Sequence, residues 1–338
     1  MQNNNIKRRQ ILKYSAAASI LAALPASVLA KPPGHLPPRS SFGKSSTAEE
    51  VTEGLDLSGL TIAITGANSG LGYETMRVLA LRGAHVIGIA RTQEKADKAC
   101  ASVEGHTTAM FLDLADWGSV VDCAERIREL NTPLDGLICN AGIMALAELE
   151  LVNGVEKQFA VNHLGHFILI NQLMDTVLAA PEGRFTLLSS GAHTSADKGI
   201  EFDNLDGSQD YVPWTAYGVS KLANALCARE LAVRVADSNA IANSLHPGVI
   251  NTNLGKHLAP WKRWAAGAVG WMFMKEIPEG AATTCYVATN PAVSEASGFY
   301  FADCNVADDG GYLLDDAMAR QLWDVSEQLT RDYLPTPA

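Results

Sequence analysis

Tyr217 and Lys221 are four residues apart in the stretch YGVSK and could act together as a proton donor and its charged partner. On a helix this spacing places the phenol and the ammonium on one face. A nearby cation lowers a tyrosine pKa from its ordinary value of about 10, so that the phenol can exchange protons near neutral pH. The pair alone is weak evidence, because the same spacing occurs on many solvated helix faces.

A glycine-rich turn, TGANSGLG, lies upstream, between an apolar run at 60–65 and a predicted helix that begins near Leu71. Glycine lets the backbone approach a pyrophosphate at a helix N-terminus, where free N–H groups and the helix dipole favour anions. The spacing differs from the usual GxGxxG fingerprint, and a simple strand-to-helix turn is the alternative. The residues of this turn that we predict to contact a nucleotide are Gly66, Asn68, Ser69, Gly70, Leu71 and Gly72.

Two further motifs, NAG at 140–142 and SS at 189–190, lie between the glycine turn and Tyr217. This order of motifs resembles the classical short-chain dehydrogenase/reductase family, from about Leu57 to the C-terminus. Four segments resemble the retinol-dehydrogenase-like branch of this family: FAVNHLGHF, YGVSKLAN, HPGVINTNL and LWDVSEQL. The resemblance implies an NAD(P)-dependent oxidoreductase that acts on CH–OH groups and their carbonyls.

The resemblance also implies a catalytic tetrad. Tyr217 would be the general acid/base on the substrate oxygen, and Ser190 would hydrogen-bond that oxygen. Lys221 would lower the Tyr217 pKa and hold the ribose, and Asn162 would anchor a water that leads protons out. These roles suit hydride transfer, because the oxygen gains or loses a proton as the carbon gains or loses hydride. Ser189 is the competing serine, but alternation along a strand turns the two hydroxyls to opposite faces.

Arg91 follows the second apolar run, where an acidic residue would bind the ribose 2′-hydroxyl of NAD. An arginine there can instead pair with the 2′-phosphate of NADP, so we expect NADP, with NAD less favoured. The alternative is that Arg91 is only a solvated charge.

For Asp113, the role of N-cap to a helix that begins near Trp117 is as plausible as a contact with adenine. The resemblance implies further cofactor contacts from Asp113, Leu114, Asn140, Ala141, Gly142, Tyr217, Lys221, Pro247, Gly248 and Thr252.

Short apolar runs alternate with helical stretches along the chain. This pattern predicts a parallel sheet covered on both faces, in a doubly wound Rossmann-type α/β fold of about seven strands and a single domain. The predicted strands lie at 60–65, 85–90, 107–111, 136–139, 184–189, 242–246 and 298–301.

The N-terminal region differs from the rest. Residues 1–30 combine a basic head, an alanine-rich middle and a small-residue end at Ala30, as in a cleavable export signal. KRRQILK resembles the twin-arginine export consensus and predicts a periplasmic protein, or a cytoplasmic one if the segment is an incidental basic tail. Residues 31–54 are rich in Pro, Ser and Gly and are predicted to be a disordered linker. The dehydrogenase domain then spans 55–338.

The composition restricts the partners. With 26 Lys and Arg against 37 Asp and Glu, the net charge of −11 disfavours nucleic acid and anionic lipid. The six cysteines have no CxxC pairs and the histidines share no ligand spacing, so we expect no metal. The resemblance implies a possible homodimer or homotetramer, through helices around 152–178 and 221–235.

The substrate is expected to be a small apolar molecule. Trp261, Trp264, Ala268 and Trp271 recur at helical spacing, which suits either an apolar substrate wall or core packing. Two other functions remain open at this point: a non-catalytic nucleotide-binding regulatory protein, and a reductase of a conjugated double bond.

Overall fold

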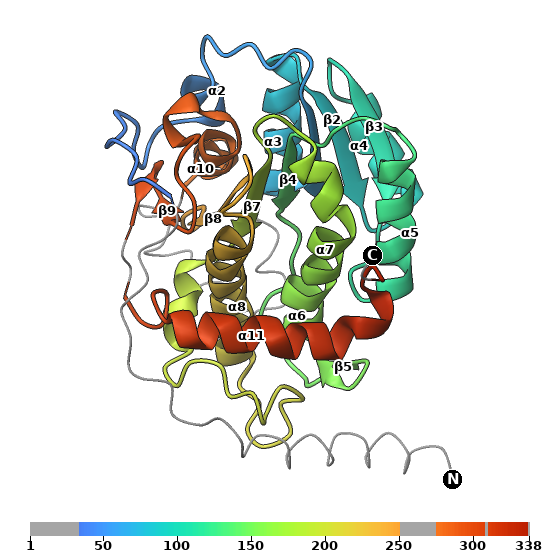
Figure 1. Cartoon of the computed structure of the whole chain (residues 1–338), viewed down its shortest axis with the longest axis vertical. Coiled ribbons are helices and arrows are strands. Elements are labelled where there is room, and N and C mark those ends of the chain that lie inside the picture. Colours follow the sequence, from blue (N-terminus) through green and yellow to red (C-terminus); the bar gives the residue numbers. More distant parts are fainter. Residues whose placement is uncertain (1–33, 251–274, 308–309, 337–338) are drawn as a thin grey trace.

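A parallel sheet forms the centre of the protein (Figure 1). The computed structural model describes residues 34–250, 275–307 and 310–336. The strand order is β10-β9-β8-β7-β4-β1-β2-β3, and only the β9–β10 pair of this described sheet is antiparallel. The strands are β1 (Thr61–Thr65), β2 (His85–Ala90), β3 (Thr107–Phe111), β4 (Gly136–Cys139), β7 (Arg184–Leu188), β8 (Ile241–His246), β9 (Tyr300–Ala302) and β10 (Asn305–Val306).

The doubly wound sheet and all seven predicted strands are confirmed: β2, β3 and β4 have the predicted bounds, and the ends of the others are shifted by one or two residues. The sequence pattern missed β10 and a small separate hairpin, β5 (Leu151–Val152) with β6 (Val155–Glu156). Each of these strands is two residues long, too short to produce a recognisable periodicity.

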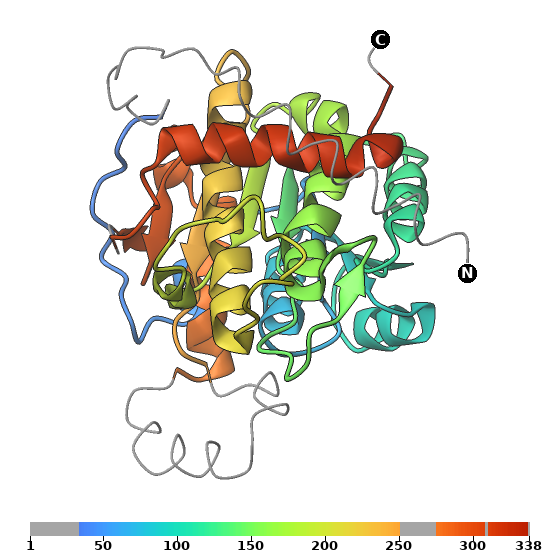
Figure 2. The same cartoon turned by 90° about the horizontal axis from the view of Figure 1, so that it is seen from below.

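Helices cover both faces of the sheet (Figures 1 and 2). Successive side chains of β1 point to opposite faces of the sheet, and both faces are buried: Ile62 and Ile64 belong to one buried cluster and Ala63 to the other. The first cluster contains residues of α2 (Ala48–Val51), α3 (Gly70–Leu81), α4 (Gln93–Ala101) and α10 (Ile277–Thr289). The second contains residues of α5 (Trp117–Arg128), α7 (Gly165–Leu178), α8 (Pro213–Arg234) and α11 (Asp316–Thr330), the last of which crosses α7 and α8.

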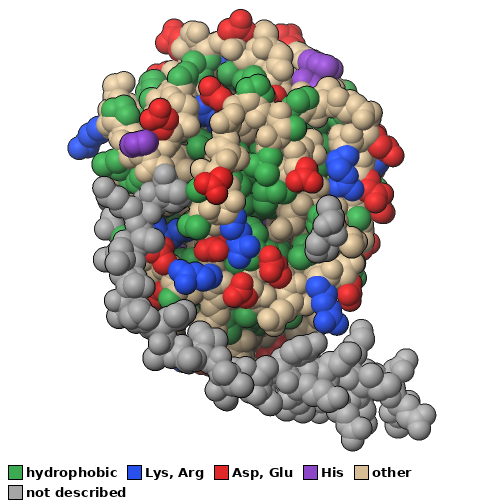
Figure 3. Space-filling model, in the orientation of Figure 1, with side chains coloured by type: hydrophobic (Ala, Val, Ile, Leu, Met, Phe, Trp, Pro, Cys, Tyr) green, Lys and Arg blue, Asp and Glu red, His purple; other side chains and the backbone are tan. Residues whose placement is uncertain are grey.

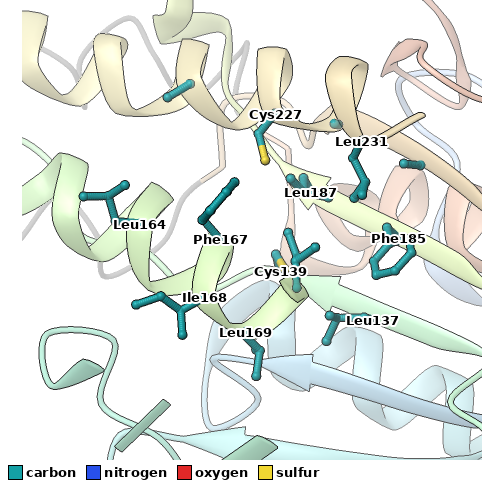
Figure 4. Close-up of a cluster of buried hydrophobic side chains, with 14 of the residues drawn as sticks. Leu137, Cys139, Leu164, Phe167, Ile168, Leu169, Phe185, Leu187, Cys227 and Leu231 are labelled. Atoms are coloured by element: carbon teal, nitrogen blue, oxygen red, sulfur yellow. The ribbon is translucent and has the colours of Figure 1, made fainter. Parts of the chain in front are cut away.

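The second cluster fixes the parts of the chain that flank the predicted site (Figure 4). Phe167 of α7 lies among side chains from β4, β7 and α8, and Cys139 ends β4 within the same cluster. Close packing of this kind permits little movement of the adjoining backbone on either side. Asn140 and His166, the chain neighbours of these two residues, are therefore held by the core.

Residues 34–54 differ from the predicted disordered linker. Ala48 and Val51 are buried in α2, which belongs to the same cluster as α3 and α10. Arg77 of α3 donates to Glu49 at 2.6 Å. The Pro-, Ser- and Gly-rich composition describes the segment as a whole, whereas its order comes from buried residues, ion pairs and hydrogen bonds such as that from Ser40 Oγ to the Cys304 carbonyl. Residues 1–30 lie outside the described residues.

The described surface is mixed in charge. On the face shown in Figure 3, acidic and basic side chains are interspersed around a central group of hydrophobic side chains. Within residues 34–250, 275–307 and 310–336, no helix is both long and apolar enough to cross a membrane.

Candidate active site

The glycine turn and the NAG segment meet at the carboxyl ends of β1 and β4. Ile64 of β1 pairs with Ile138 of β4, while β2 lies on the other side of β1. The chain therefore winds away in opposite directions from these two strands. Open α/β sheets bind nucleotides at such a topological switch point.

Thr65, the last residue of β1, fixes the two segments to each other. Its carbonyl accepts from Asn140 Nδ2 at 2.7 Å, and its Oγ1 accepts the N–H groups of Asn140 and Ala141 at 3.0 and 2.9 Å. Gly66 follows with φ +74°, and a Cβ there would lie 2.9 Å from Asn140 Nδ2. Only glycine suits this close approach.

The N-terminus of α3 faces the same edge and fits a pyrophosphate. Ser69 stands at the N-cap position but its side chain makes no capping hydrogen bond. Backbone N–H groups in the first turn of a helix have no partner within that helix, so an uncapped N-terminus can donate to an anion. A Cβ on Gly72 would lie 2.3 Å from the carbonyl oxygen of Gly66, so the turn admits no side chain there. Asn68 and Ser69 are exposed, whereas Leu71 is buried.

Arg91 follows β2 directly and is exposed. Thr92, the next residue, caps α4 through a hydrogen bond from Lys95 N–H to its hydroxyl. The arginine thus stands at the strand end where the sequence predicted a contact with the ribose phosphate.

Asp113 does not cap α5. Its carboxylate accepts the N–H of Ala115 at 3.0 Å, whereas Asp116 is the N-cap and accepts from Gly118. The helix begins at Trp117 as predicted, but the capping alternative for Asp113 is wrong, because Asp116, directly before the helix, is the N-cap. Leu114 is buried, so its side chain belongs to the core.

Asn162 lies in a π-helical turn, Ala160–Leu164, which leads into α7. Its Oδ1 accepts from Ile143 N–H at 2.8 Å. Its Nδ2 donates to the Ile143 carbonyl and to Ser220 Oγ, both at 2.9 Å. π-Turns often occur at functional sites. This buried carboxamide ties the chain after the NAG motif to α8.

Tyr217 and Lys221 share one face of α8. They are 9% and 5% exposed, and Lys221 Nζ lies 5.8 Å from the centre of the Tyr217 ring. The ammonium donates to the Leu188 carbonyl at 3.0 Å. A Cβ on Gly142 would lie 3.1 Å from Asn162 Oδ1 and 3.4 Å from Lys221 Nζ. The predicted tetrad and the NAG motif thus come together.

The pKa of Tyr217 is shifted in the direction opposite to our prediction. Burial raises it above its ordinary value, and the hydrogen bond with Ser190 only partly opposes this. Burial lowers the pKa of Lys221 to about 8. Removing a phenolate from water is costly, and this cost outweighs the opposing hydrogen bond with Ser190.

The two adjacent serines have different partners. Ser189 is buried and donates to the Lys221 carbonyl at 2.7 Å. Ser190 caps the short helix Gly191–Ser195 by accepting from Ala192 N–H at 3.2 Å, and it also bonds Tyr217. Ser189 therefore fixes α8 to the end of β7, whereas Ser190 stands beside the phenol.

The described histidines and the cysteines take part in packing and hydrogen bonding. His246 Nδ1 accepts from Gly191 N–H at 3.0 Å, and His163 Nε2 lies 2.8 Å from Ser326 Oγ. Among the described residues, no three His, Cys, Asp or Glu side chains form a group that could hold a metal ion. All six cysteines are free and buried, and burial raises the pKa of Cys123 to about 11.

The predicted cofactor contacts that follow β8, at Pro247, Gly248 and Thr252, are only partly described. Gly248 has φ +98°, and a Cβ there would lie 2.7 Å from Lys275 Cδ, so the lysine stem packs on the glycine. Lys275 is buried and pairs with Asp303 at 2.6 Å. Pro247 precedes this glycine, and Thr252 lies outside the described residues, as do Trp261, Trp264, Ala268 and Trp271.

Sequence reasoning missed two residues of this region. Ser220 accepts from Asn162 and donates to the Tyr217 carbonyl at 2.7 Å. His166 contacts both Asn162 and Thr65. The available signals were a polar residue beside Lys221 and a histidine four positions after Asn162.

Comparisons with known proteins agree with this arrangement. The chain is 40% identical over 308 residues to "Short-chain dehydrogenase TIC 32 A, chloroplastic" of Brassica napus, covering 86% of this chain and 95% of the relative. It is 38% identical over 290 residues to "Retinol dehydrogenase 14" of Homo sapiens, covering 80% and 85%. The structure of a putative NAD(P)-dependent gluconate 5-dehydrogenase from Beutenbergia cavernae, with bound NADP at low occupancy, matches with a TM-score of 0.59 and 25% identity, covering 73% and 96%.

The predicted periplasmic location is wrong by this comparison. The Brassica napus relatives TIC 32 A and B are chloroplastic, hence organellar rather than bacterial periplasmic proteins. A basic N-terminal segment without acidic residues is common to export signals and to transit peptides, so this pattern does not distinguish them.

The profile of the family described as short chain dehydrogenase matches residues 60–263, which include the glycine turn, the NAG motif and all four residues of the tetrad. Together with the oxidoreductase relatives and the fold, this match shows that the chain belongs to the short-chain dehydrogenase family of oxidoreductases.

Proposed function

We propose that this protein is an NADP-dependent oxidoreductase that interconverts a lipophilic alcohol and its aldehyde or ketone. The main support is the meeting of Tyr217, Ser190, Lys221 and Asn162 beside a glycine turn that fits a pyrophosphate. The relative named retinol dehydrogenase supports an apolar alcohol, and the structure containing NADP supports that nucleotide.

In this proposal the chain supplies the proton and the orientation. The bound nicotinamide supplies or accepts the hydride. During carbonyl reduction Tyr217 donates its phenolic proton to the substrate oxygen, and Ser190 hydrogen-bonds that oxygen. Lys221, 5.8 Å from the ring, stabilises the tyrosinate that remains. Asn162 holds the backbone at Ile143 and, through Ser220, the helix that carries Tyr217. Alcohol oxidation reverses the proton transfer.

A substrate screen tests this proposal. The full chain is incubated with NADPH and a series of aldehydes, ketones and enones, and with NADP⁺ and the matching alcohols, while nucleotide absorbance and products are followed. We expect consumption of NADPH with formation of an alcohol. Saturation of the C=C bond of enones as the only reaction would favour the double-bond reductase instead. Nucleotide binding without any turnover would favour a regulatory protein.

Exchanging Arg91 for aspartate should change the cofactor preference. Arg91→Asp replaces a partner for the 2′-phosphate with an acceptor for the 2′-hydroxyl. A hydrogen bond to a charged group contributes about 1.5 to 3 kcal/mol, so the ratio of kcat/KM for NADPH over NADH should fall at least about tenfold.

Lys98→Asp is the matched control, because Lys98 is exposed on α4 and undergoes the same change of charge. The control should leave the cofactor ratio unchanged. A ratio that moves equally in both variants would indicate a long-range charge effect and contradict a contact at Arg91.

Trp214 provides an apolar surface next to the proton donor. It lies in the first turn of α8, is 47% exposed, and its ring centre lies 5.6 Å from that of Tyr217. A large exposed aromatic ring contributes contact area at little entropic cost. We infer that the apolar part of the substrate packs against this ring while its oxygen bonds Tyr217.

Trp214→Ala should therefore reduce kcat/KM for a long-chain or ring-bearing aldehyde about tenfold, with a much smaller effect on a short aldehyde, since tenfold corresponds to about 1.4 kcal/mol of lost contact. Val212→Ala is the control, because Val212 is also 47% exposed and stands just before the helix without an aromatic contact to Tyr217. Equal losses for both substrate sizes would show that Trp214 supports Tyr217 and not the substrate.

A further inference from the structure

His166 connects the π-helical turn that carries Asn162 to β1, the strand that leads into the glycine turn. It is buried near the start of α7, and its Nδ1 lies 2.9 Å from the Asn162 carbonyl oxygen. Its Nε2 lies 2.9 Å from Thr65 Oγ1. The same hydroxyl oxygen accepts the N–H groups of Asn140 and Ala141. One imidazole thus touches both halves of the candidate site.

The direction of every hydrogen bond in this group follows from the chemistry of its atoms. A carbonyl oxygen only accepts, so Nδ1 of His166 carries the hydrogen. In a neutral imidazole Nε2 is then an acceptor, and Thr65 must donate its one hydroxyl hydrogen to it. The two lone pairs of Thr65 Oγ1 are taken by the two backbone N–H groups. Both the tautomer and the hydroxyl orientation are therefore fixed.

This arrangement holds His166 in its neutral form. A proton added at Nε2 would meet a hydroxyl oxygen whose lone pairs already accept two hydrogen bonds. Burial lowers the pKa of His166 to about 4, and the charge of Lys221 acts in the same direction. The imidazole therefore connects Asn162 and Thr65 throughout the neutral pH range.

The chain of hydrogen bonds continues to the catalytic tyrosine. Asn162 Nδ2 donates to Ser220 Oγ, and Ser220 donates to the Tyr217 carbonyl. A continuous path therefore runs from the NAG segment through Thr65, His166, Asn162 and Ser220 to the backbone of Tyr217. The side chains of this path, those of Thr65, His166, Asn162 and Ser220, are all buried.

We propose that His166 is a positioning residue that fixes the tetrad relative to the nucleotide-binding turn. It touches neither substrate nor cofactor. It acts by joining Asn162 to Thr65, and so to the NAG segment. This proposal rests on the proposed function, since it requires that the turn binds a nicotinamide nucleotide and that the tetrad reacts with it.

A double-mutant cycle tests the proposal. His166→Leu and Thr65→Val, singly and together, are compared with wild type by NADPH titration, by kcat and by thermal unfolding. We expect each single variant to weaken NADPH binding and lower kcat about tenfold. The double variant should lose no more than the worse single one, because both changes break the same link. Thr65→Ser keeps the hydroxyl and should stay close to wild type.

His163→Leu is the matched control. His163 lies in the adjacent π-turn, is equally buried, and bonds Ser326 of α11 instead of β1. It should lower the melting temperature without changing the NADPH Kd or kcat. If His166→Leu does not fold, His166→Asn keeps a donor near the Asn162 carbonyl and removes the acceptor for Thr65.

The outcomes separate this proposal from the function on which it rests. A wild-type protein that binds neither NADPH nor NADH overturns both. A wild type that binds and turns over, with His166 variants that only lose thermal stability as His163→Leu does, overturns the positioning role alone. Additive losses in the cycle also overturn it, because they would show that the two residues act separately.

Discussion

Tyr217→Phe is expected to lower turnover by about 10² or more while leaving the NADPH Kd within about twofold of wild type. The change removes one hydroxyl and keeps the ring, so the packing against Trp214 at 5.6 Å remains. The loss of the hydroxyl removes the only proton that this side chain can give to the substrate oxygen. Steady-state rates with a saturating carbonyl substrate and a separate nucleotide titration measure the two effects independently.

Tyr211→Phe is the control for this variant. Tyr211 also donates through its hydroxyl, to the Leu146 carbonyl at 2.8 Å, but it lies in the segment before α8 and outside the tetrad. It should keep most of the wild-type turnover. If Tyr217→Phe retains more than about a tenth of wild-type turnover, Tyr217 is not the proton donor.

The sheet was predictable because its strands are continuous apolar runs between helices. Both faces of β1 are buried, so the run needs no polar alternation and stands out in the sequence. The order of the residues near α2 was not predictable in this way. Ala48 and Val51 occur in a segment whose composition resembles a linker, and its order is seen only in tertiary contacts, with α3 and α10 and between Ser40 and Cys304.

The site was predictable as a set of motifs but not as a network. Thr65 and His166 are 101 residues apart in sequence, and no local pattern connects them. The direction in which the pKa of Tyr217 is shifted was also missed, because helical spacing indicates that Tyr217 lies near Lys221 but does not indicate how deeply the phenol is buried. Spacing thus finds the partners, whereas the electrostatics depend on how the tertiary structure excludes water.

Lys221→Met is expected to lower turnover by about 10² or more and to raise the NADPH Kd, yet to increase the free energy of unfolding at neutral pH. The ammonium is 5% exposed, and burial lowers its pKa from 10.5 to about 8. Since one pKa unit corresponds to about 1.36 kcal/mol, keeping this charge costs the folded state on the order of 3 kcal/mol. Methionine removes that cost. The Leu188 carbonyl keeps a partner, because Asn224 Nδ2 also donates to it at 3.0 Å.

The pH dependence of this stability gain identifies its cause. Below pH 8 the lysine is charged in both the folded and the unfolded chain, so the full cost of burial is present. Between pH 8 and 10.5 the unfolded chain binds more protons than the folded one, so the wild type gains stability as the pH rises and the advantage of the variant shrinks. Urea unfolding at about pH 7 and about pH 9.5 measures the difference, with exposed Lys98→Met as the control that should show no gain.

Two outcomes would contradict a buried charge at Lys221: a variant less stable than wild type at neutral pH, or a stability advantage that does not change with pH. Turnover of Lys221→Met above about a tenth of wild type would contradict the catalytic role. The opposite signs expected for activity and stability separate a lysine kept for its chemistry from one kept for the fold.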